Sequence, residues 1–543
     1  MADVLVVGAG PVGLTMAAEL ARHGCRCRII DRLEAPSGYC KAIGVTPRTL
    51  EVWEDMGVAR TMIDNGLWLI GIRTIVPGRP VHDAIVDLSD LPYGSLGIPQ
   101  YATERILGEH LGRLGGAVDR GIALSGLREE DDQVAVELEH TDGRTERASY
   151  RFVVGCDGAH SAVRHAAGFG FPGDAFPMEF MLGDVMIDWD VPRGLAVFAV
   201  EPHDDAPPDL VVAIPLPERR RYRIAMVEPP EPSAPAVEGH GIMAHRPGPP
   251  LAELQAVTDT LFPGKPRLLD LRWSARFHIS TRIADKYRAG NVFIAGDAAH
   301  IHPPAGGLGM NTGVQDAYNL AWKMALVLRG KAGAELLDSY EAERRPVGVE
   351  VVERTKAVSI SMGRDRKKED RLADTQILVN YRGTPWVADA LPGDGPRAGD
   401  RAPDAYGLSR DHVGFPLRLF EVLRGTEHVV IVPLGAGSVA RDRVEAFARE
   451  INERHGDLAR IVAVATDDAD APDLIGVPLL RDREGAFRRA YGAGDEAVWV
   501  SGPTAISAPI RRCPTVPPST PISGASSPAV VVDQAWRCDV PRR

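Results

Sequence analysis

A short glycine-rich turn near the N-terminus constrains this chain more than any other feature. Gly8, Gly10 and Gly13 stand between an apolar β-branched run and a segment with helical spacing. Gly8 permits the tight turn, Gly10 lets the backbone approach a pyrophosphate, and Gly13 lets the helix and the strand pack closely. A second strand then ends at Asp31, where an acid can accept hydrogen bonds from a ribose diol. We therefore predict a βαβ unit that binds a dinucleotide at the helix N-terminus.

Two further motifs narrow the choice of nucleotide. Asp157-Gly158 follows a predicted strand and precedes Arg164, and Gly296-Asp297 follows another predicted strand. An acid in that position lies at the mouth of a parallel sheet, where ligands bind. The glycine-rich segment 303–311 then leads into a long predicted helix. Such an approach to a helix N-terminus suits a flat ring system that becomes anionic when it is reduced.

Length and charge exclude several other classes of protein. The 543 residues are enough for two to four domains. The net charge of −12 argues against a nucleic-acid partner, and we see no apolar run of the roughly 18 residues that a membrane span needs. The six cysteines are scattered and form no disulfide framework. We expect a reduced, cytoplasmic protein without a membrane or nucleic-acid partner.

The order of the predicted elements indicates an α/β chain of several domains. Residues 134–139 and 145–154 alternate as antiparallel strands, and a proline-dense stretch, 229–250, is predicted to be a surface loop. A linker rich in Gly, Pro and Asp precedes a small separate α/β domain. The predicted domains are a discontinuous Rossmann-type domain at 1–175 and 275–390, a β-rich substrate domain at 176–274, a C-terminal α/β domain at 399–500 and a divergent tail at 501–543.

Together, the three motifs resemble those of the class A flavoprotein aromatic hydroxylases. The long form of that family, with an appended C-terminal domain, includes phenol hydroxylases, chlorophenol monooxygenases and polyketide-tailoring oxygenases. The resemblance covers roughly residues 1–500. It implies that 1–175 and 275–390 bind FAD, that 399–500 is thioredoxin-like, and that NAD(P)H reduces the flavin. It also implies that O2 then forms a C4a-hydroperoxyflavin, which hydroxylates an aromatic ring, phenolic or polyketide.

The resemblance also implies roles for particular residues. Asp31 would hold the adenosine ribose, Lys41 or Arg105 would approach the FAD phosphates, and Asp297 would hold the ribityl chain. The motif that contains Asp157 would serve both FAD and NAD(P)H. The predicted cofactor-binding residues are Gly8, Gly10, Gly13, Asp31, Lys41, Arg105, Asp157, Gly158, Arg164, Gly296, Asp297, Pro303, Gly306, Gly307, Gly309, Met310 and Asn311.

Some of these side chains have an ordinary structural alternative. Asp157 could simply cap a turn, and Lys41 could be a solvated charge. Arg48 could face the active site or only pair with a nearby acid. His300 and His302 have a metal-like spacing, but no third ligand stands at a useful distance along the sequence, so we predict no metal site.

The chain departs from phenol hydroxylases where a tyrosine and an aspartate handle the phenolic proton. The corresponding positions here are Phe277 and Ile43, which cannot do acid–base work. Arg276 and His278 remain as polar catalytic candidates, with a structural role equally open. This departure disfavours simple phenol as the substrate and favours a larger, already activated ring.

The C-terminal part departs in two further ways. Residues 399–500 contain no Cys-x-x-Cys, so we expect a structural role or a dimer contact rather than redox chemistry. After Val500 the related proteins continue with Arg-Pro-Asp-Gly-Tyr-Ile, whereas this chain reads Ser501-Gly-Pro-Thr-Ala-Ile. Suitable codons for this peptide would encode the family sequence after a one-base shift. We therefore interpret 501–543 as a frameshifted, partly disordered tail, with a divergent linker as the alternative.

The leading hypothesis is an NAD(P)H-dependent FAD monooxygenase that hydroxylates an aromatic ring. A Baeyer–Villiger oxygenase on the same scaffold, acting on a polyketide ketone, is the nearest alternative, and only the product structure separates the two. A protein that binds FAD without turnover is an alternative of another class. No segment argues for a flavin reductase or a halogenase.

Overall fold

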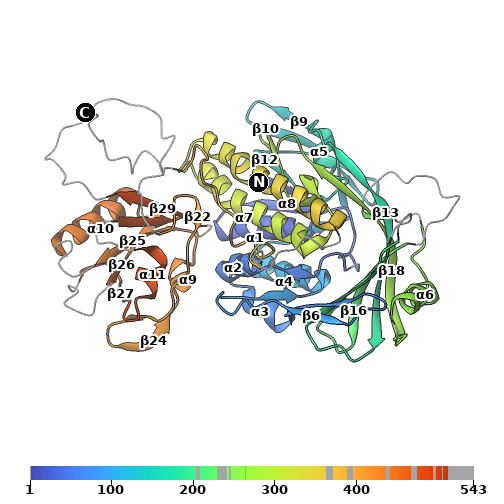
Figure 1. Ribbon diagram of the computed structural model, residues 1–543. Coiled ribbons are helices and arrows are strands. Elements are labelled where there is room, and N and C mark those ends of the chain that lie inside the picture. Colours follow the sequence, from blue (N-terminus) through green and yellow to red (C-terminus); the bar gives the residue numbers. More distant parts are fainter. Residues whose placement is uncertain are drawn as a thin grey trace. The chain divides into compact units, whose positions relative to one another are not determined.

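A computed structural model describes residues 2–38, 40–203, 208–228, 241–243, 246–262, 264–361, 371–387, 395–434, 441–465, 474–492, 497–503 and 506–511 (Figure 1). The chain divides into two compact units. Unit 1 comprises Met1–Trp53, Gly57–Tyr318 and Arg344–Gln376, and unit 2 comprises Glu54–Met56, Asn319–Glu343 and Ile377–Arg543. In these described ranges, no helix is both long and apolar enough to cross a membrane.

The predicted βαβ unit is confirmed. Strand β1 (Val4–Val7), helix α1 (Pro11–Arg22) and strand β2 (Cys27–Asp31) follow one another, and the two strands pair in parallel. They belong to a six-stranded sheet with the order β19-β20-β12-β1-β2-β8. The other strands of this sheet are β8 (Val118–Arg120), β12 (Phe152–Gly155), β19 (Arg288–Ala289) and β20 (Val292–Ile294).

The prediction of one antiparallel strand over 145–154 is wrong. Strand β11 (Thr145–Tyr150) ends before Arg151, and β12 then pairs in parallel with β1 in the other sheet. Side chains alternate between the two faces of β11, as in a half-exposed strand, whereas all of β12 is buried. Strand β11 forms a small antiparallel sheet with β9 (Ile122–Glu130) and β10 (Gln133–His140).

The β-rich segment forms most of a nine-stranded sheet. Its strands β13 (Gly173–Asp188) and β18 (Arg267–Ile283) pair antiparallel, and the predicted boundaries at 175/176 and 274/275 fall inside them. The sheet also takes up β5 (Gly71–Ile75) and β6 (His82–Ile85), which the sequence analysis did not assign to it. The remaining strands are β14 (Leu195–Glu201), β15 (Asp209–Pro215), β16 (Arg221–Val227), β17 (Gly241–Ile242) and β21 (His300–Ile301). Residues 229–240 and 244–245 of the predicted loop lie outside the described residues.

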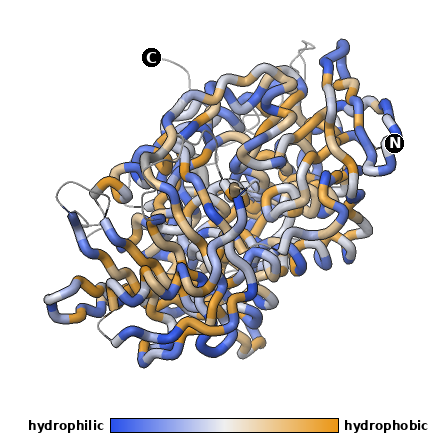
Figure 2. Tube along the Cα trace, turned by 90° about the vertical axis from the view of Figure 1, so that its right-hand side faces the viewer, coloured by the Kyte–Doolittle hydropathy of each residue, from blue (hydrophilic) through white to orange (hydrophobic). Residues whose placement is uncertain are grey.

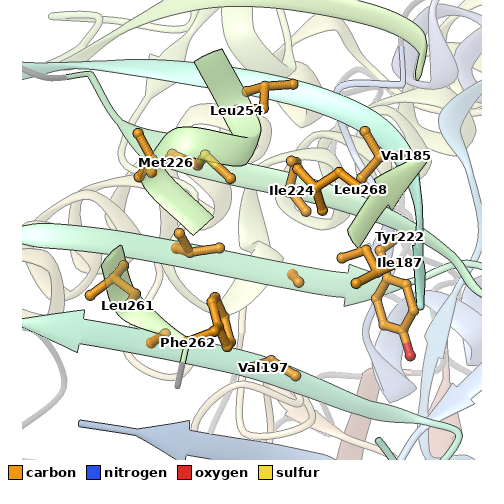
Figure 3. Packing of buried hydrophobic residues seen from close by; sticks show 14 of the residues in the cluster. Val185, Ile187, Val197, Tyr222, Ile224, Met226, Leu254, Leu261, Phe262 and Leu268 are labelled. Carbon is orange, nitrogen blue, oxygen red and sulfur yellow. The ribbon is translucent and has the colours of Figure 1, made fainter. Parts of the chain in front are cut away.

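One face of this sheet is covered by helix α6 (Leu251–Leu261). Tyr222, Ile224 and Met226 of β16 alternate onto that face and pack with Leu254 and Leu261 in a common buried cluster (Figure 3). Since successive side chains of a strand point to opposite faces, Arg221 and Arg223 emerge on the other face of the sheet.

The other regular elements that the structure describes in unit 1 are helices and one small sheet of β3 (Gly44–Val45), β7 (Ser95–Gly97) and β4 (Leu67–Leu69). Hydrophobic and hydrophilic stretches alternate along the chain (Figure 2). Helix α7 (Leu308–Leu328) begins in unit 1 and ends in unit 2, whereas helix α8 (Asp338–Ser361) begins in unit 2 and ends in unit 1. The helices are α2 (Pro47–Asp55), α3 (Ala59–Asp64), α4 (Gln100–Arg113), α5 (Ala162–Ala166), α7 (Leu308–Leu328) and α8 (Asp338–Ser361).

Unit 2 contains an eight-stranded sheet with the order β22-β29-β28-β25-β26-β27-β23-β24. Buried apolar clusters lie on both of its faces. Its strands are β22 (Asp400–Arg401), β23 (Leu408–Arg410), β24 (Val413–Leu417), β25 (His428–Leu434), β26 (Ala459–Ala465), β27 (Leu479–Arg481), β28 (Ala497–Ser501) and β29 (Ile506–Arg511), and its helices include α9 (Leu419–Leu423), α10 (Arg441–His455) and α11 (Ala486–Tyr491). Of the predicted tail, 504–505 and 512–543 lie outside the described residues.

Candidate active site

The glycine turn has the geometry that a pyrophosphate site requires. A Cβ on Gly8 would lie 2.4 Å from the carbonyl oxygen of Cys156, and φ of Gly8 is +99°. A Cβ on Gly13 would lie 1.9 Å from the carbonyl oxygen of Gly8, so only glycine lets α1 start so close to the turn. A Cβ on Gly10, in contrast, would meet no described atom within 4 Å, which leaves room at the N-terminus of α1 for a phosphate.

Asp31 lies at the carboxyl end of β2, next to this turn. Its Oδ2 accepts a hydrogen bond from the amide of Ala9 at 2.7 Å, and its Oδ1 accepts one from the amide of Leu33 at 2.8 Å. These bonds hold the carboxylate beside the glycine turn. A carboxylate oxygen has more than one lone pair, so Asp31 can still accept a hydrogen bond from a ribose hydroxyl.

Two of the predicted cofactor contacts, Asp297 and Lys41, lie close enough for their charges to interact. The side chains of both residues are exposed. Desolvation by the surrounding protein raises the pKa of Asp297, while the charges of His300 and Lys41 oppose that rise. An accessible carboxylate with protein around it and a lysine nearby matches the hydroxyl-rich and phosphate-bearing parts of FAD.

Arg105 does not join this group. It is exposed on α4, where it pairs with Glu109 at 2.8 Å and donates to Asn65 Oδ1 at 3.1 Å. The side chain of Glu104 is buried instead, and its charge interacts with those of Asp31 and Lys41. The helical rotation between adjacent residues therefore turns Arg105 away from Asp31 and Lys41.

Sequence reasoning missed Gln100 and Glu104 as the residues of α4 that face this site. Gln100 Nε2 donates to Glu104 Oε1 at 2.8 Å, and the amide of Ala42 donates to Gln100 Oε1 at 3.0 Å. Burial raises the pKa of Glu104, although the Gln100 hydrogen bond and the charges of Arg120 and Lys41 oppose the rise. The signal was the i, i+4 spacing of two polar residues on a helix directly after Pro99.

The Asp157 motif serves the packing of two loops. Ser161 is the N-cap of α5, and Val163 donates its amide to Asp157 Oδ2 at 3.2 Å, so Asp157 also holds the start of this helix. Arg164 is buried and donates to the carbonyl of Ala159 at 2.7 Å and to that of Ala298 at 3.0 Å. Arg164 thus joins the Asp157-Gly158 loop to the Gly296-Asp297 loop. Gly158 has a φ of +81°, which favours glycine in this turn.

The segment Pro303–Asn311 brings a glycine-rich backbone to the start of α7. Gly306 and Gly307 both have positive φ, and a Cβ on Gly307 would lie 3.6 Å from the Cα of Gly44. Asn311 is fully buried and donates to the carbonyls of Gly44 at 2.8 Å and Gly307 at 2.7 Å. Asn311 therefore positions the loop against strand β3 rather than presenting its side chain to a ligand. Pro303 is buried, whereas Gly309 and Met310 are partly exposed.

A buried ionic network beneath the Gly296-Asp297 loop was also missed. Asp316 Oδ2 accepts hydrogen bonds from the amide of Gly296 at 3.1 Å and from His300 Nε2 at 2.8 Å, and Arg344 Nε donates to Asp316 Oδ1 at 2.8 Å. Burial alone would raise the pKa of Asp316, but Arg344 and His300 hold it below its ordinary value. The signal was a stripe of polar residues on a helix of otherwise apolar residues, 312–323.

The two histidines of the metal-like spacing have separate roles. His300 pairs with Asp316, whereas His302 Nδ1 lies 2.9 Å from the carbonyl of Pro303. Burial and the charge of His300 lower the pKa of His302 to about 4, so its imidazole is neutral at physiological pH. Within the described parts of the chain, no three His, Cys, Asp or Glu side chains converge on a possible metal site.

The three weak catalytic candidates are held by the protein itself. Arg48 is buried and pairs with Glu51 at 2.8 Å. Arg276 pairs with Glu228 and, at 3.0 Å, with Glu253. His278 is buried in β18, in register with Glu179 of β13 and with Gly241 of β17. For Arg48, this geometry matches the alternative of a pair with a nearby acid.

The residues therefore fit FAD on the evidence of their own geometry. The space beside Gly10, the accessible Asp297 near Lys41 and the glycine-rich approach to α7 form three separate contact regions. By their spacing along the chain, these regions would suit the pyrophosphate, the ribityl chain and the ring system that the sequence motifs predict. Such a fold and site define a flavin-dependent oxidoreductase.

Comparisons with known proteins agree with this class. Residues 1–355 match the family model described as "FAD binding domain". The chain is 36% identical to the rifampicin monooxygenase of Streptomyces venezuelae over 66% of this chain and 71% of that protein. It is 31% identical, over 88% of this chain and 93% of that protein, to the 12-dehydrotetracycline 5-monooxygenase/anhydrotetracycline 6-monooxygenase of Streptomyces rimosus.

A solved structure extends the similarity to almost the whole chain. The complex of aklavinone-11 hydroxylase with FAD and aklavinone superposes with a TM-score of 0.76 and 25% identity, and covers 99% of this chain and 98% of that one. The chain belongs to the FAD binding domain family and, within it, to the flavin-dependent aromatic monooxygenases. The names of these relatives favour hydroxylation over the Baeyer–Villiger alternative.

Proposed function

We propose that this enzyme uses NADH or NADPH and O2 to hydroxylate an electron-rich polycyclic aromatic compound of the polyketide type. The observation that carries the proposal is the combination of an FAD binding domain with an apolar segment at Ile43. Ile43 is buried with Cys40 and Leu216, and Trp273 packs against the same cluster. A wall of this kind suits a large ring system better than a simple phenol that needs a base.

The proposed mechanism assigns positioning to the protein and redox chemistry to the cofactor. Bound FAD supplies the electron transfer to O2 that side chains cannot perform. The N-terminus of α1 would bind its phosphates, and Asp297 would accept hydrogen bonds from its ribityl hydroxyls. The first backbone N–H groups of α7 would face the ring and stabilise negative charge there. The apolar surroundings of Ile43 would exclude water from the reacting atoms.

The proposal for unit 2 is a thioredoxin-like domain with a structural role, for example at a homodimer contact. Strand β25 pairs in parallel with β26 and antiparallel with β28, and β28 pairs antiparallel with β29. That central arrangement supports the proposal.

Sequencing the gene tests the frameshift hypothesis for 501–543. If the codons cannot encode the family peptide in another reading frame, the hypothesis is wrong.

The test of function is oxidation of NADH and NADPH by the FAD-loaded protein, measured with a panel of phenols and polycyclic quinones. We expect at least one polycyclic compound to accelerate the oxidation and to gain the mass of one oxygen atom. A phenol or quinol product supports hydroxylation, whereas an ester or lactone supports the Baeyer–Villiger reaction. Bound FAD with no accelerated oxidation and only peroxide as product would contradict the proposal.

A further inference from the structure

A short segment at the end of unit 1, residues 371–376, lies against the glycine-rich loop that leads into α7. A Cβ on Gly306 of that loop would lie 3.0 Å from Oδ1 of Asp374. Arg354 of α8 donates to the carbonyl of Ala373 and, at 2.5 Å, to Asp374 Oδ1. The segment is therefore held between α8 and the loop.

Gln376, the last residue of this segment, combines an unusual backbone conformation with a buried side chain. Its φ is +60°, in the left-handed region that residues with a large side chain rarely adopt. Such a conformation is costly and persists only where the surrounding structure fixes it. The side chain of Gln376 is buried, and both ends of its amide are hydrogen-bonded. These contacts hold the residue in place.

The amide of Gln376 connects α7 with the segment that follows strand β3. Its Nε2 donates to Thr312 Oγ1 at 2.9 Å, and its Oε1 accepts from Gln315 Nε2 at 2.8 Å; both partners lie on α7. Oε1 also accepts a hydrogen bond from the hydroxyl of Thr46 at 3.2 Å. Because a side-chain amide carries a donor and an acceptor on one rigid plane, it can fix both segments at once.

Two of these partners continue to the first peptides of α7. Thr312 Oγ1 donates to the carbonyl of Leu308 at 2.9 Å. The amide of Thr46 donates to Asn311 Oδ1 at 2.9 Å, and Asn311 Nδ2 donates to the carbonyl of Gly307 at 2.7 Å. The glutamine is thus connected to the carbonyl of Leu308 through one side chain, and to the carbonyl of Gly307 through two residues.

The carbonyls of Gly307 and Leu308 determine where the first N–H groups of α7 point. A peptide unit is planar, so a carbonyl and the N–H of the next residue turn together. A hydrogen bond that fixes the carbonyl of Gly307 therefore also fixes the direction of the N–H of Leu308. The N–H groups at the start of a helix carry the partial positive charge of the helix, so their direction determines where a negative charge is stabilised.

We propose that Gln376 is a positioning residue of the flavin site, which fixes the first peptides of α7 so that their N–H groups stabilise negative charge on reduced FAD. This inference rests on the proposed function, in which the start of α7 faces the flavin ring. Gln376 acts through Thr46, Thr312 and Asn311, and its own side chain touches neither cofactor nor substrate. It should therefore influence the redox equilibrium of bound FAD more than the binding of oxidised FAD.

The expected effect follows from the charge of the two forms of the cofactor. A hydrogen bond to a charged group contributes more than one to a neutral group. Loss of the N–H alignment should weaken the binding of reduced FAD about tenfold more than that of oxidised FAD. For a two-electron couple, a tenfold change in this ratio lowers the midpoint potential by about 30 mV.

The test compares the midpoint potential of FAD in Gln376→Gly with that in the native enzyme. Glycine adopts a φ of +60° without strain, so this change removes the side chain and leaves the backbone conformation accessible. His412→Gly is the matched control, because His412 has a φ of +62° and an exposed side chain in unit 2. The potential is measured by stepwise reduction against a reference dye, and the Kd of oxidised FAD by flavin fluorescence. We expect a decrease of about 30 mV in Gln376→Gly and no change in His412→Gly.

A second variant tests the route through Thr46. Thr46→Val removes the hydroxyl that donates to Gln376 and keeps a side chain of similar shape. It should lower the potential in the same direction by a smaller amount. Since both changes act on the same peptides, the double variant should shift the potential by less than the sum of the single shifts. If Gln376→Gly does not fold, as circular dichroism will show, the potential of Thr46→Val decides.

The outcomes separate this inference from a structural role and from the proposed function. Equal losses of affinity for oxidised and reduced FAD would leave the midpoint potential unchanged and overturn the positioning role of Gln376. No substrate enters these measurements, so the proposed function would still stand if an aromatic compound accelerates NAD(P)H oxidation and gains one oxygen atom. In the opposite case, a lowered potential in Gln376→Gly without any oxygenated product from the native enzyme would support the positioning role and contradict the proposed function.

Discussion

The buried carboxylate of Asp316 offers the sharpest test of how the Gly296-Asp297 loop is held. Replacement of Asp316 by Asn keeps the shape of the side chain but removes its charge. Arg344 is fully buried, and its Nε donates to Asp316 at 2.8 Å. In Asp316→Asn, one of the three donors, Gly296, His300 or Arg344, would meet an amide NH2 in place of an oxygen.

The expected loss follows from the burial of both partners. Removal of one member of a buried ion pair typically costs about 3–5 kcal/mol, because the other charge stays desolvated. We expect a decrease of that size in the free energy of unfolding of Asp316→Asn at pH 7. The pKa of Asp316 is lowered in the folded state, so its stabilisation is complete above the ordinary aspartate value of 3.8 and is lost as the pH falls through the folded value. The difference between the native protein and the variant should therefore shrink in strong acid.

The measurement is urea unfolding, followed by tryptophan and flavin fluorescence on the FAD-loaded protein. Flavin release from Asp316→Asn should begin at a lower urea concentration than in the native enzyme. Asp64→Asn is the control, because Asp64 forms an exposed helical pair with Arg60 at 3.0 Å, for which we expect no measurable change. An Asp316→Asn variant within about 1 kcal/mol of the native protein would refute the reasoning, as buried pairs should exceed that value.

Further predictions concern the cofactor turn, its neighbours and a buried histidine. Gly10→Val should fold but lose FAD affinity by about tenfold or more, whereas Gly13→Ala should also lower the melting temperature, as circular dichroism will show, because its Cβ overlaps the backbone. Lys41→Ala should weaken FAD binding by about 10- to 100-fold through loss of a charge-assisted contact, while Arg105→Ala should bind FAD normally; equal effects in flavin titrations would argue against this assignment. Burial lowers the pKa of His428 to about 4, so neutral His428 stabilises the fold above pH 6.5 and this contribution is lost as the pH falls toward 4. The free energy of unfolding of His428→Asn should thus decline less steeply than that of the native protein between pH 6.5 and pH 4. Urea unfolding at several pH values checks this, and the same pH profile for both proteins would contradict the prediction.

The short motifs could be predicted because the residues that specify each of them are neighbours in the sequence. A strand, a turn with glycines at fixed positions and a helix are specified by neighbouring residues, and the φ of Gly8 needs no distant contact to be inferred. The same holds for Gly296-Asp297 after a buried strand. The separation of β11 from β12 was harder to predict from the sequence, because a short run of apolar residues fits both an antiparallel and a parallel sheet.

The sequence by itself determined the nucleotide-binding class, the order of the motifs and the absence of acid–base side chains at Ile43 and Phe277. Only the tertiary structure decided which charges meet. It turned Arg105 toward Glu109, buried Asp316 beside Arg344 and left Arg223 with a carbonyl and an indole ring. The physical reason is that the energy of a charge depends on its burial and on partners far away in the sequence, which residue order alone does not specify.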